Sequence, residues 1–373
     1  MLSSHFESKA GRDLSGILDA ISGMPSLTSL DIGQLTGRLL DNFALLGLQS
    51  LVRLEKLSCS LDMEDALPEI IPQLTRLREL TLRAHMPPRH LHAISALQHL
   101  ETLELHAPGN LLELMPVVAP IKSLRKLRLT RPDRGDGSRA RMDAMYGEED
   151  GEPQDGLLPV AQQVTHLDIF STDVGEGVMK YLARALPGLV QLELEDSRCL
   201  ATNLPHLQGI AGLRELYIGQ GWTSDAVVRG ALPEPGLKGF PALQNLYLSG
   251  VNGSELLPTG DISLLVPHTL LDLQLGFTTP GIHQPAEIDP DDFLRAVRAA
   301  PSLNTIELEN VLHLAPYTDP DDDEEAIDLP AAAPDLESVY DMRERLFEAV
   351  PGLKHLDIDD HFWTRQPASG CVT

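Results

Sequence analysis

Two clusters of side chains have residue types that could bind a metal ion. His85, His90 and His92 lie within the segment AHMPPRHLH, and imidazole nitrogens are common ligands of transition metals. The run DPDDDEE from Asp319 to Glu325 offers carboxylate oxygens of the kind that Ca²⁺ prefers, but it lacks the glycine and the distant glutamate of an EF-hand loop. We therefore interpret the histidines as surface residues beside a short helix and the acids as a solvated loop. No metal or other cofactor is expected.

The sequence contains no pattern of a nucleotide-binding or catalytic site. The phosphate loop G-x-x-x-x-G-K-[ST], a G-x-G-x-x-G turn after a strand and the zinc motif H-E-x-x-H are all absent. The three cysteines, Cys59, Cys199 and Cys371, are far apart and odd in number, which fits neither a disulfide framework nor a zinc site. We expect Cys59 and Cys199 to be small core residues, and we expect no enzymatic activity.

The composition limits the class of partner. With 29 Lys and Arg against 55 Asp and Glu, the formal net charge is −26, which disfavours nucleic acids and anionic membrane surfaces. No run of 18 apolar residues suggests a membrane span, and the acids near the N-terminus argue against a signal or transit peptide. We expect a cytoplasmic or nuclear protein that binds other proteins and has no small-molecule substrate.

The elements that must position any binding residues follow from a repeated pattern, Leu-x-x-Leu-x-Leu, in which Ile, Val or Cys can substitute. Its last three positions alternate apolar, polar, apolar, which is typical of a short strand with one buried face. Strands stacked in phase would form a parallel sheet over one continuous aliphatic core. Twelve copies begin at Leu27, Leu54, Leu77, Leu100, Leu124, Val164, Leu189, Leu213, Leu243, Leu270, Leu303 and Leu353.

Helical patterns lie between several of these copies. In GEGVMKYLARALPGL, Val178, Leu182 and Leu186 recur at helical spacing before a Pro-Gly pair. In DPDDFLRAVRAAPSL, Asp289 is placed as an N-cap. A third helix is expected from about residue 335 to 350, so most repeats are predicted to run strand, loop, helix.

The sequence resembles the leucine-rich repeat superfamily over roughly residues 24 to 360. Helix-bearing repeats such as VGEGVMKYLARALPGLVQLELED are similar to those of ribonuclease-inhibitor-like proteins and of F-box receptors. The resemblance implies an α/β solenoid of about twelve repeats, with parallel strands on a concave face and helices on a convex face. One departure is that no copy has the family's Asn or Cys at the ninth position, where Thr172, Ser197 and Thr278 could partly replace it.

The expected domain plan is a single repeat array. Residues 1–23 are predicted to form an N-terminal capping helix or partial repeat, residues 24–362 the repeat domain, and residues 363–373 a C-terminal tail. Insertions rich in Gly, Pro and charge interrupt the array at about 130–156, 276–290 and 315–334.

The third, fifth and seventh positions of each copy should point away from the core. In copies one to five they hold four Lys or Arg and three acids, whereas in copies six to twelve they hold nine acids and no Lys or Arg. Residues 1–141 hold 17 Lys and Arg against 16 acids, and residues 142–373 hold 12 against 39. The residues that we predict to contact a partner are Asp168, Phe170, Glu193, Glu195, Glu215, Tyr217, Tyr247, Asp272, Glu307, Glu309, Asp357 and Asp359.

The resulting prediction is a protein-interaction scaffold or adaptor whose acidic concave face binds a basic segment. A solvated face that only keeps the array soluble is the plain alternative. Two functional alternatives are a substrate-recognition subunit of a ubiquitin ligase that lacks an evident F-box, and a Ran-type GTPase activator. The basic run from Lys122 to Arg141 is interpreted as a second protein contact, or as a partner of the acidic loop beside it, rather than as an RNA site.

Overall fold

The computed structural model describes residues 20–32, 46–59, 67–83, 91–106, 111–130, 159–170, 174, 176–195, 199–219, 228–229, 231–251, 262–277, 290–309, 336–358 and 361–365. The chain divides into two compact units, Met1–Glu195 and Asp196–Thr373, so the predicted repeat domain spans both. Most of the capping segment and of the three insertions lies outside the described residues, as do His85, His90 and the acidic run from Asp319.

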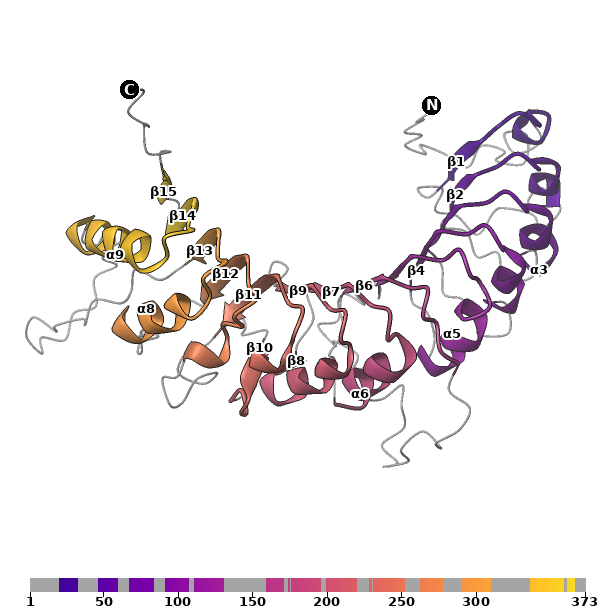
Figure 1. Ribbon diagram of the computed structural model, residues 1–373. Coiled ribbons are helices and arrows are strands. Elements are labelled where there is room, and N and C mark those ends of the chain that lie inside the picture. Colours follow the sequence, from indigo (N-terminus) through magenta and orange to yellow (C-terminus); the bar gives the residue numbers. More distant parts are fainter. Residues whose placement is uncertain are drawn as a thin grey trace, which may run out of the picture. The chain divides into compact units, whose positions relative to one another are not determined.

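The first unit is built on seven parallel strands in sequence order. They are β1 (Ser29–Ile32), β2 (Lys56–Cys59), β3 (Glu79–Leu82), β4 (Thr102–His106), β5 (Lys126–Thr130), β6 (His166–Phe170) and β7 (Gln191–Glu195). The connections hold α3 (Leu67–Ile70), α5 (Leu111–Val118), α6 (Glu176–Ala185) and 3₁₀ turns at Gly47–Ser50, Ile71–Gln73 and His92–Ala96. Within the unit, the helices and turns lie on the side of the repeats opposite the strands (Figure 1).

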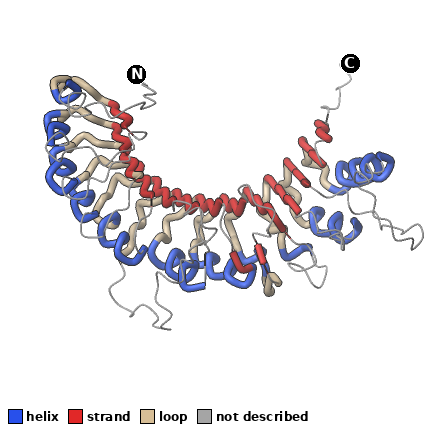
Figure 2. Tube along the Cα trace, turned by 180° about the vertical axis from the view of Figure 1, so that it is seen from behind, coloured by secondary structure: helices blue, strands red, loops and turns tan. Residues whose placement is uncertain are grey.

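The second unit repeats this plan. Its strands are β8 (Cys199–Leu200), β9 (Glu215–Gly219), β10 (Val228–Arg229), β11 (Asn245–Val251), β12 (Asp272–Phe277), β13 (Thr305–Glu309), β14 (His355–Ile358) and β15 (His361–Thr364). The main sheet has the order β9-β11-β12-β13-β14-β15, and β10 pairs with β11 and with β8. Its helical elements are α8 (Pro290–Arg298), α9 (Leu336–Ala349) and 3₁₀ turns at Ala201–Gly209, Gly236–Gly239 and Ile262–Leu264. Figure 2 shows the strands of the main sheet apart from the helices within each unit, and the labels of Figure 1 place the short strands β8 and β10 beside the helical elements.

The register of the strands keeps the leucine pattern in phase. Leu57 of β2 pairs with Leu30 of β1 and with Leu80 of β3, and in the second unit Leu246 pairs with Leu216 and Leu273. Each of the twelve motif copies contributes one of these parallel strands. The apolar positions are buried, so equivalent leucines pack on one another from repeat to repeat. Burial of one such side chain contributes about 1.5–3 kcal/mol.

Helix α6 shows why the intervening segments fold as predicted. Val178 and Leu182 face the core, while Glu176 and Lys180 lie four residues apart on the exposed face with 2.6 Å between carboxylate and ammonium. The helix ends before the Pro-Gly pair. A Cβ atom on Gly188 would lie 2.0 Å from the carbonyl oxygen of Gln162, so this close approach to the preceding repeat requires glycine.

Side chains ahead of the strands bridge neighbouring repeats. Ser123 Oγ lies 2.8 and 2.7 Å from the carbonyl oxygens of Gln98 and Leu100 and donates its one hydrogen to either. Gln163 Nε2 lies 3.0–3.2 Å from three carbonyl oxygens of the turn after α5. These bonds connect each turn to the repeat beside it. The ninth-position residues proposed for this role, Thr172, Ser197 and Thr278, lie outside the described residues.

The C-terminal end of the second unit differs from the sequence plan. Strand β15 pairs antiparallel with β14 and places Trp363 opposite Leu356. Arg365 donates hydrogen bonds to the carbonyl groups of Phe347 and Pro351 at the end of α9. The predicted boundary between repeat domain and tail, after residue 362, therefore falls inside a strand that covers the edge of the sheet. Among the described helices, none is long and apolar enough to cross a membrane.

Candidate functional site

One face of each sheet carries the third, fifth and seventh positions of the motif. The burial pattern alternates along the strands, as in β4, where Leu103 and Leu105 are buried and the residues on either side are partly exposed. We call this surface the strand face of each unit. The parallel register places residues of equal motif position side by side, so the third and fifth positions form continuous rows across neighbouring strands.

On the strand face of the first unit, acids lie beside basic side chains of the same chain. Lys56 Nζ lies 2.6 Å from Glu79 Oε1 on the adjacent strand, and His106 Nε2 lies 3.0 Å from Glu104 Oε1. The hydrogen bond from His106 lowers the pKa of Glu104, and the charges of Arg128 and Arg83 act in the same direction against the effect of partial burial.

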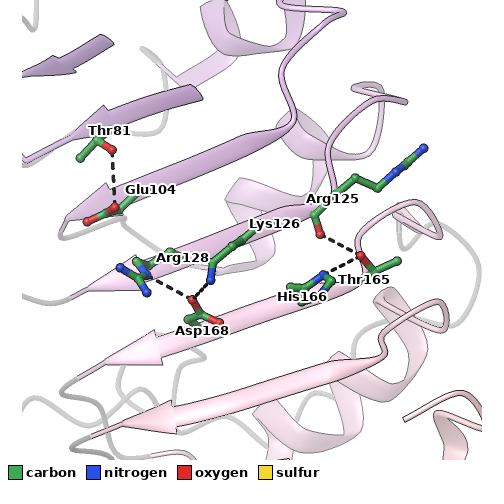
Figure 3. A network of polar contacts seen from close by, with 8 residues as sticks. All are labelled: Thr81, Glu104, Arg125, Lys126, Arg128, Thr165, His166 and Asp168. Carbon is green, nitrogen blue, oxygen red and sulfur yellow. Dashed lines mark hydrogen bonds and ion pairs between the residues drawn. The ribbon is translucent and has the colours of Figure 1, made fainter. Parts of the chain in front are cut away.

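Asp168 is the most strongly paired of these acids (Figure 3). Its Oδ2 atom lies 2.8 Å from Lys126 Nζ and 3.1 Å from Arg128 Nε. The side chain is fully buried, whereas those of Lys126 and Arg128 are 35% and 36% exposed. The Oδ1 atom is also buried and has no hydrogen-bond partner among the described residues. Two cations from β5 thus cover one carboxylate of β6.

This arrangement gives Asp168 two ion-pair partners within the chain, and its contact with a partner protein stays a prediction. The guanidinium of Arg128 also lies over the ring of Phe170, with 5.0 Å from Cζ to the ring centroid. The chain's own cations therefore occupy both residues. The signal was present in the sequence, because Arg128 and Asp168 hold the same motif position in consecutive copies and the register pairs them directly.

Strand β7 carries the last two predicted contacts of the first unit. Glu193 is half-buried and pairs in register with Asp168, while the side chain of Glu195 lies outside the description. Within the basic run, Lys126 and Arg128 serve as internal partners of Asp168, and Arg125 donates to the carbonyl of Gln163 at 3.1 Å. The part of that run beyond Thr130 lies outside the described residues.

The strand face of the second unit carries acids and aromatic rings. Tyr217 and Tyr247 pair in register on β9 and β11, with ring centroids 6.3 Å apart and planes inclined by 39°. Tyr217 Oη donates to Glu215 Oε2 at 3.4 Å. With its amide oriented to suit its neighbours, Asn245 donates to Asp272 Oδ2 at 3.1 Å. Glu215 and Asp272 thus receive hydrogen bonds from neutral donors.

The remaining predicted contacts continue along this face. Glu307 and Asp357 pair in register on β13 and β14, and both are half-buried. The side chain of Glu309 and the whole of Asp359 lie outside the description. By sequence, the third, fifth and seventh positions of the five copies in this unit hold six acids and no Lys or Arg.

Phe362 is a member of this face that the leucine pattern missed. It lies on β15 opposite Asp357, stacks on His355 with 6.0 Å between ring centroids, and is 61% exposed. The motif could not indicate it, because β15 has no leucine triplet. The alternation in HFWT was the only available signal.

Both units therefore repeat one element. A leucine-patterned strand pairs in phase and in parallel with the equivalent strand of the next copy, and a helix or 3₁₀ turn closes each repeat on the opposite side. The chain has the leucine-rich repeat fold. Its expected α/β solenoid class is confirmed.

Comparisons with known proteins add similarities of fold at low identity. No protein-family model matches the sequence, and no curated protein matches it. Solved structures that are similar include an internalin from Listeria monocytogenes, with 16% identity, 81% of this chain and 91% of that chain covered, and a TM-score of 0.39. Another is a leucine-rich repeat protein of Leptospira interrogans, with 15% identity, 91% of each chain covered and a TM-score of 0.40. The repeat domain of a type III effector has 17% identity, coverage of 82% and 86%, and a TM-score of 0.40. The assignment of the fold rests on the repeat and its register, not on these similarities.

Two features bear on the chemistry available to the described repeats. Within the described part of the chain, no group of three or more His, Cys, Asp or Glu is arranged to hold a metal ion. Burial, and next the charge of Asp31, raises the pKa of Cys59 to about 12, so its thiol stays protonated and is a poor nucleophile.

Proposed function

We propose that this leucine-rich repeat protein is a non-enzymatic interaction scaffold whose second unit binds a basic segment of a partner protein on its strand face. One contrast between the two units carries the proposal. Glu79, Glu104 and Asp168 on the first strand face each lie beside Lys, Arg or His. On the second face, Glu215 and Asp272 receive hydrogen bonds from a tyrosine and an asparagine.

Acids that lie opposite each other on neighbouring strands raise the energy of the unbound protein. Adjacent strands are about 4.8 Å apart, and like charges on cross-strand neighbours are destabilising. The pair formed by Glu307 and Asp357 is of this kind, because the two residues lie opposite each other on β13 and β14. A partner that brings Lys and Arg would relieve this repulsion, so charge complementarity favours a basic ligand.

The size of the face sets the length of the segment that it can hold. The four steps from β9 to β14 span about 19 Å at the usual strand spacing. An extended peptide covers that distance with about six residues at about 3.3 Å each. A segment of six to nine residues with several Lys or Arg therefore matches the described surface.

The test compares two variants that lose the same charge. We neutralise three acids of the face, Glu215→Gln, Asp272→Asn and Glu307→Gln, and as a control three exposed acids of the same unit, Glu234→Gln, Glu344→Gln and Glu348→Gln. Captured proteins are quantified by mass spectrometry, and basic segments within them are then made as peptides and titrated directly. Binding should be lost with the first variant, persist with the second, and weaken as ionic strength rises.

Equal binding by the two variants would contradict the proposal. The same capture addresses the alternatives, because enrichment of cullin adaptors would favour a ubiquitin-ligase receptor. A GTP-hydrolysis assay with small GTPases addresses the activator alternative, for which accelerated hydrolysis is the supporting result.

A further inference from the structure

Two tyrosines stand next to each other at the β9 end of the second strand face. Tyr217 and Tyr247 occupy the same motif position on β9 and β11, and both are half-buried, so each ring is partly accessible. Two carboxylates lie in the neighbouring third-position row, Glu215 on β9 and Asp272 on β12, with Asn245 of β11 between them.

A glycine at the end of β9 helps to set the position of the second ring. A Cβ atom on Gly219 would lie 3.3 Å from Cε1 of Tyr247, which is closer than an ordinary contact. Glycine therefore allows the Tyr247 ring to lean toward β9 and toward Tyr217. Aromatic rings held in this way offer contact area with little loss of side-chain entropy on binding.

Tyr217 remains a neutral phenol at physiological pH. Burial is the main cause that raises its pKa, and the nearby charge of Glu215 adds to the effect. The hydroxyl therefore keeps its proton for the hydrogen bond to Glu215, and the ring keeps the negative face that attracts cations.

The first unit shows how this protein completes a similar set of groups. There, Arg128 of β5 covers a ring and a carboxylate of the adjacent strand β6. Its guanidinium lies over Phe170 and donates a hydrogen bond to Asp168. The arginine uses its planar face for the ring and its N–H groups for the carboxylate, which lysine cannot do with one compact ammonium group.

The second unit has the rings and the carboxylates but no arginine at any motif position of its strand face. We propose that an arginine side chain of the bound segment fills this place, stacking on the Tyr217–Tyr247 pair and donating to Glu215 and Asp272. The inference rests on the proposed binding of a basic segment and assigns its anchor. Fixed charges alone would not distinguish arginine from lysine, whereas this site does.

The test uses the full chain and three labelled nonapeptides of sequence (Gly-Ser-X)₃, in which X is arginine, lysine or citrulline. Citrulline keeps the planar shape but carries no charge. Fluorescence anisotropy at low salt should show the arginine peptide binding about three- to fivefold more tightly than the lysine peptide, as expected for a cation–π contact at a partly exposed site. The citrulline peptide should not bind measurably.

Three variants locate the effect. Tyr247→Leu should bring the arginine and lysine peptides to equal affinity, and Tyr247→Phe should keep the preference because the ring remains. Phe170→Leu is the matched control, since its ring is already covered by Arg128, and it should leave the preference unchanged. The wild-type comparison of the three peptides does not depend on any variant folding.

Each outcome separates the two proposals. Equal binding of arginine and lysine peptides, abolished by neutralising Glu215, Asp272 and Glu307, would overturn the arginine anchor and leave the basic-segment proposal standing. An arginine preference that survives Tyr247→Leu would also overturn it. Failure of both basic peptides to bind the wild-type chain would overturn both proposals.

Discussion

Replacing Asp168 by asparagine should destabilise the protein measurably, because the substitution removes two ion pairs of a buried carboxylate. The side chain keeps its volume and loses its charge, so the ion pairs to Lys126 Nζ at 2.8 Å and Arg128 Nε at 3.1 Å disappear. Hydrogen bonds to charged groups are worth about 1.5–3 kcal/mol each, and removing one partner of a fully buried pair costs about 3–5 kcal/mol.

Two features reduce this cost below the fully buried case. The Lys126 and Arg128 side chains are about one-third exposed, so each can recover hydration when the carboxylate is gone. The buried Oδ1 atom of Asp168 has no hydrogen-bond partner within the described residues. The desolvation of this atom therefore already destabilises the wild-type protein, which offsets part of the stability that the ion pairs contribute. We therefore expect a loss of about 2 kcal/mol, or about 4–8 °C in Tm for a unit of this size.

The control is Glu79→Gln, which removes another cross-strand ion pair of the same strand face. Lys56 and Glu79 are 2.6 Å apart but 56% and 48% exposed, so the expected loss is about 0.5 kcal/mol or less. Urea unfolding followed by far-UV circular dichroism measures both. We attribute the larger loss at Asp168 to the burial of its carboxylate beneath Lys126 and Arg128. Equal losses of stability for the two variants, or a loss under about 0.5 kcal/mol for Asp168→Asn, would refute this explanation.

Three further predictions concern single residues. The hydrogen bond from His106 lowers the pKa of Glu104. The stabilising effect of the Glu104 carboxylate is therefore complete above about pH 4.5 and is lost as the pH falls through the folded pKa. Unfolding curves of wild type and Glu104→Gln should converge below the folded pKa. The buried Cys59 thiol, with its pKa raised to about 12, should resist iodoacetamide at pH 8 until urea unfolds the chain, and peptide mass spectrometry would expose rapid native labelling as a contradiction. Gly236→Ala should destabilise the protein by more than about 1 kcal/mol, because φ is +63° and the new Cβ would lie 2.5 Å from a backbone oxygen. Gly177 lies on α6, where a new Cβ would meet no atom within 4 Å, so Gly177→Ala should stabilise the protein by about 0.5–1 kcal/mol in the same thermal melt.

The sequence was sufficient for the repeating parts of the fold. Alternation in LRELTL or LQNLYL predicts a strand with one buried face, and repetition in phase predicts the pairing of Leu80 with Leu57 and Leu103. The helix at Glu176–Ala185 follows from apolar residues at helical spacing before Pro-Gly. Such features are local or strictly periodic, so one chain suffices to find them.

The parts that break the period could not be found in this way. Strand β15 has no leucine triplet, and its antiparallel pairing with β14 depends on a short turn that periodicity does not specify. The bridging bonds of Ser123 and Gln163 come from turn positions that the motif leaves undefined. They depend on how one repeat sits against the one before it.

The candidate site was predicted as a row of positions but not as a charge distribution. Motif numbering placed both Asp168 and Glu215 on the strand face as acids that contact a partner. In the structure, Asp168 lies under two cations, whereas Glu215 lies beside a tyrosine. The difference depends on which side chain reaches across from the neighbouring strand. Comparing rows between consecutive copies, rather than counting acids over all of them, would have separated the two.

The binding surface on the second unit can be tested most directly by site-specific photo-cross-linking in cell extract. A benzophenone side chain is placed at Gln274, which is half-buried on the strand face of β12, and in a second protein at Glu348, which is exposed on α9. We expect position 274 to form adducts with partner segments rich in arginine and lysine, and position 348 to form none with such segments. Adducts formed only from position 348, or adducts at 274 with segments lacking basic residues, would contradict this expectation.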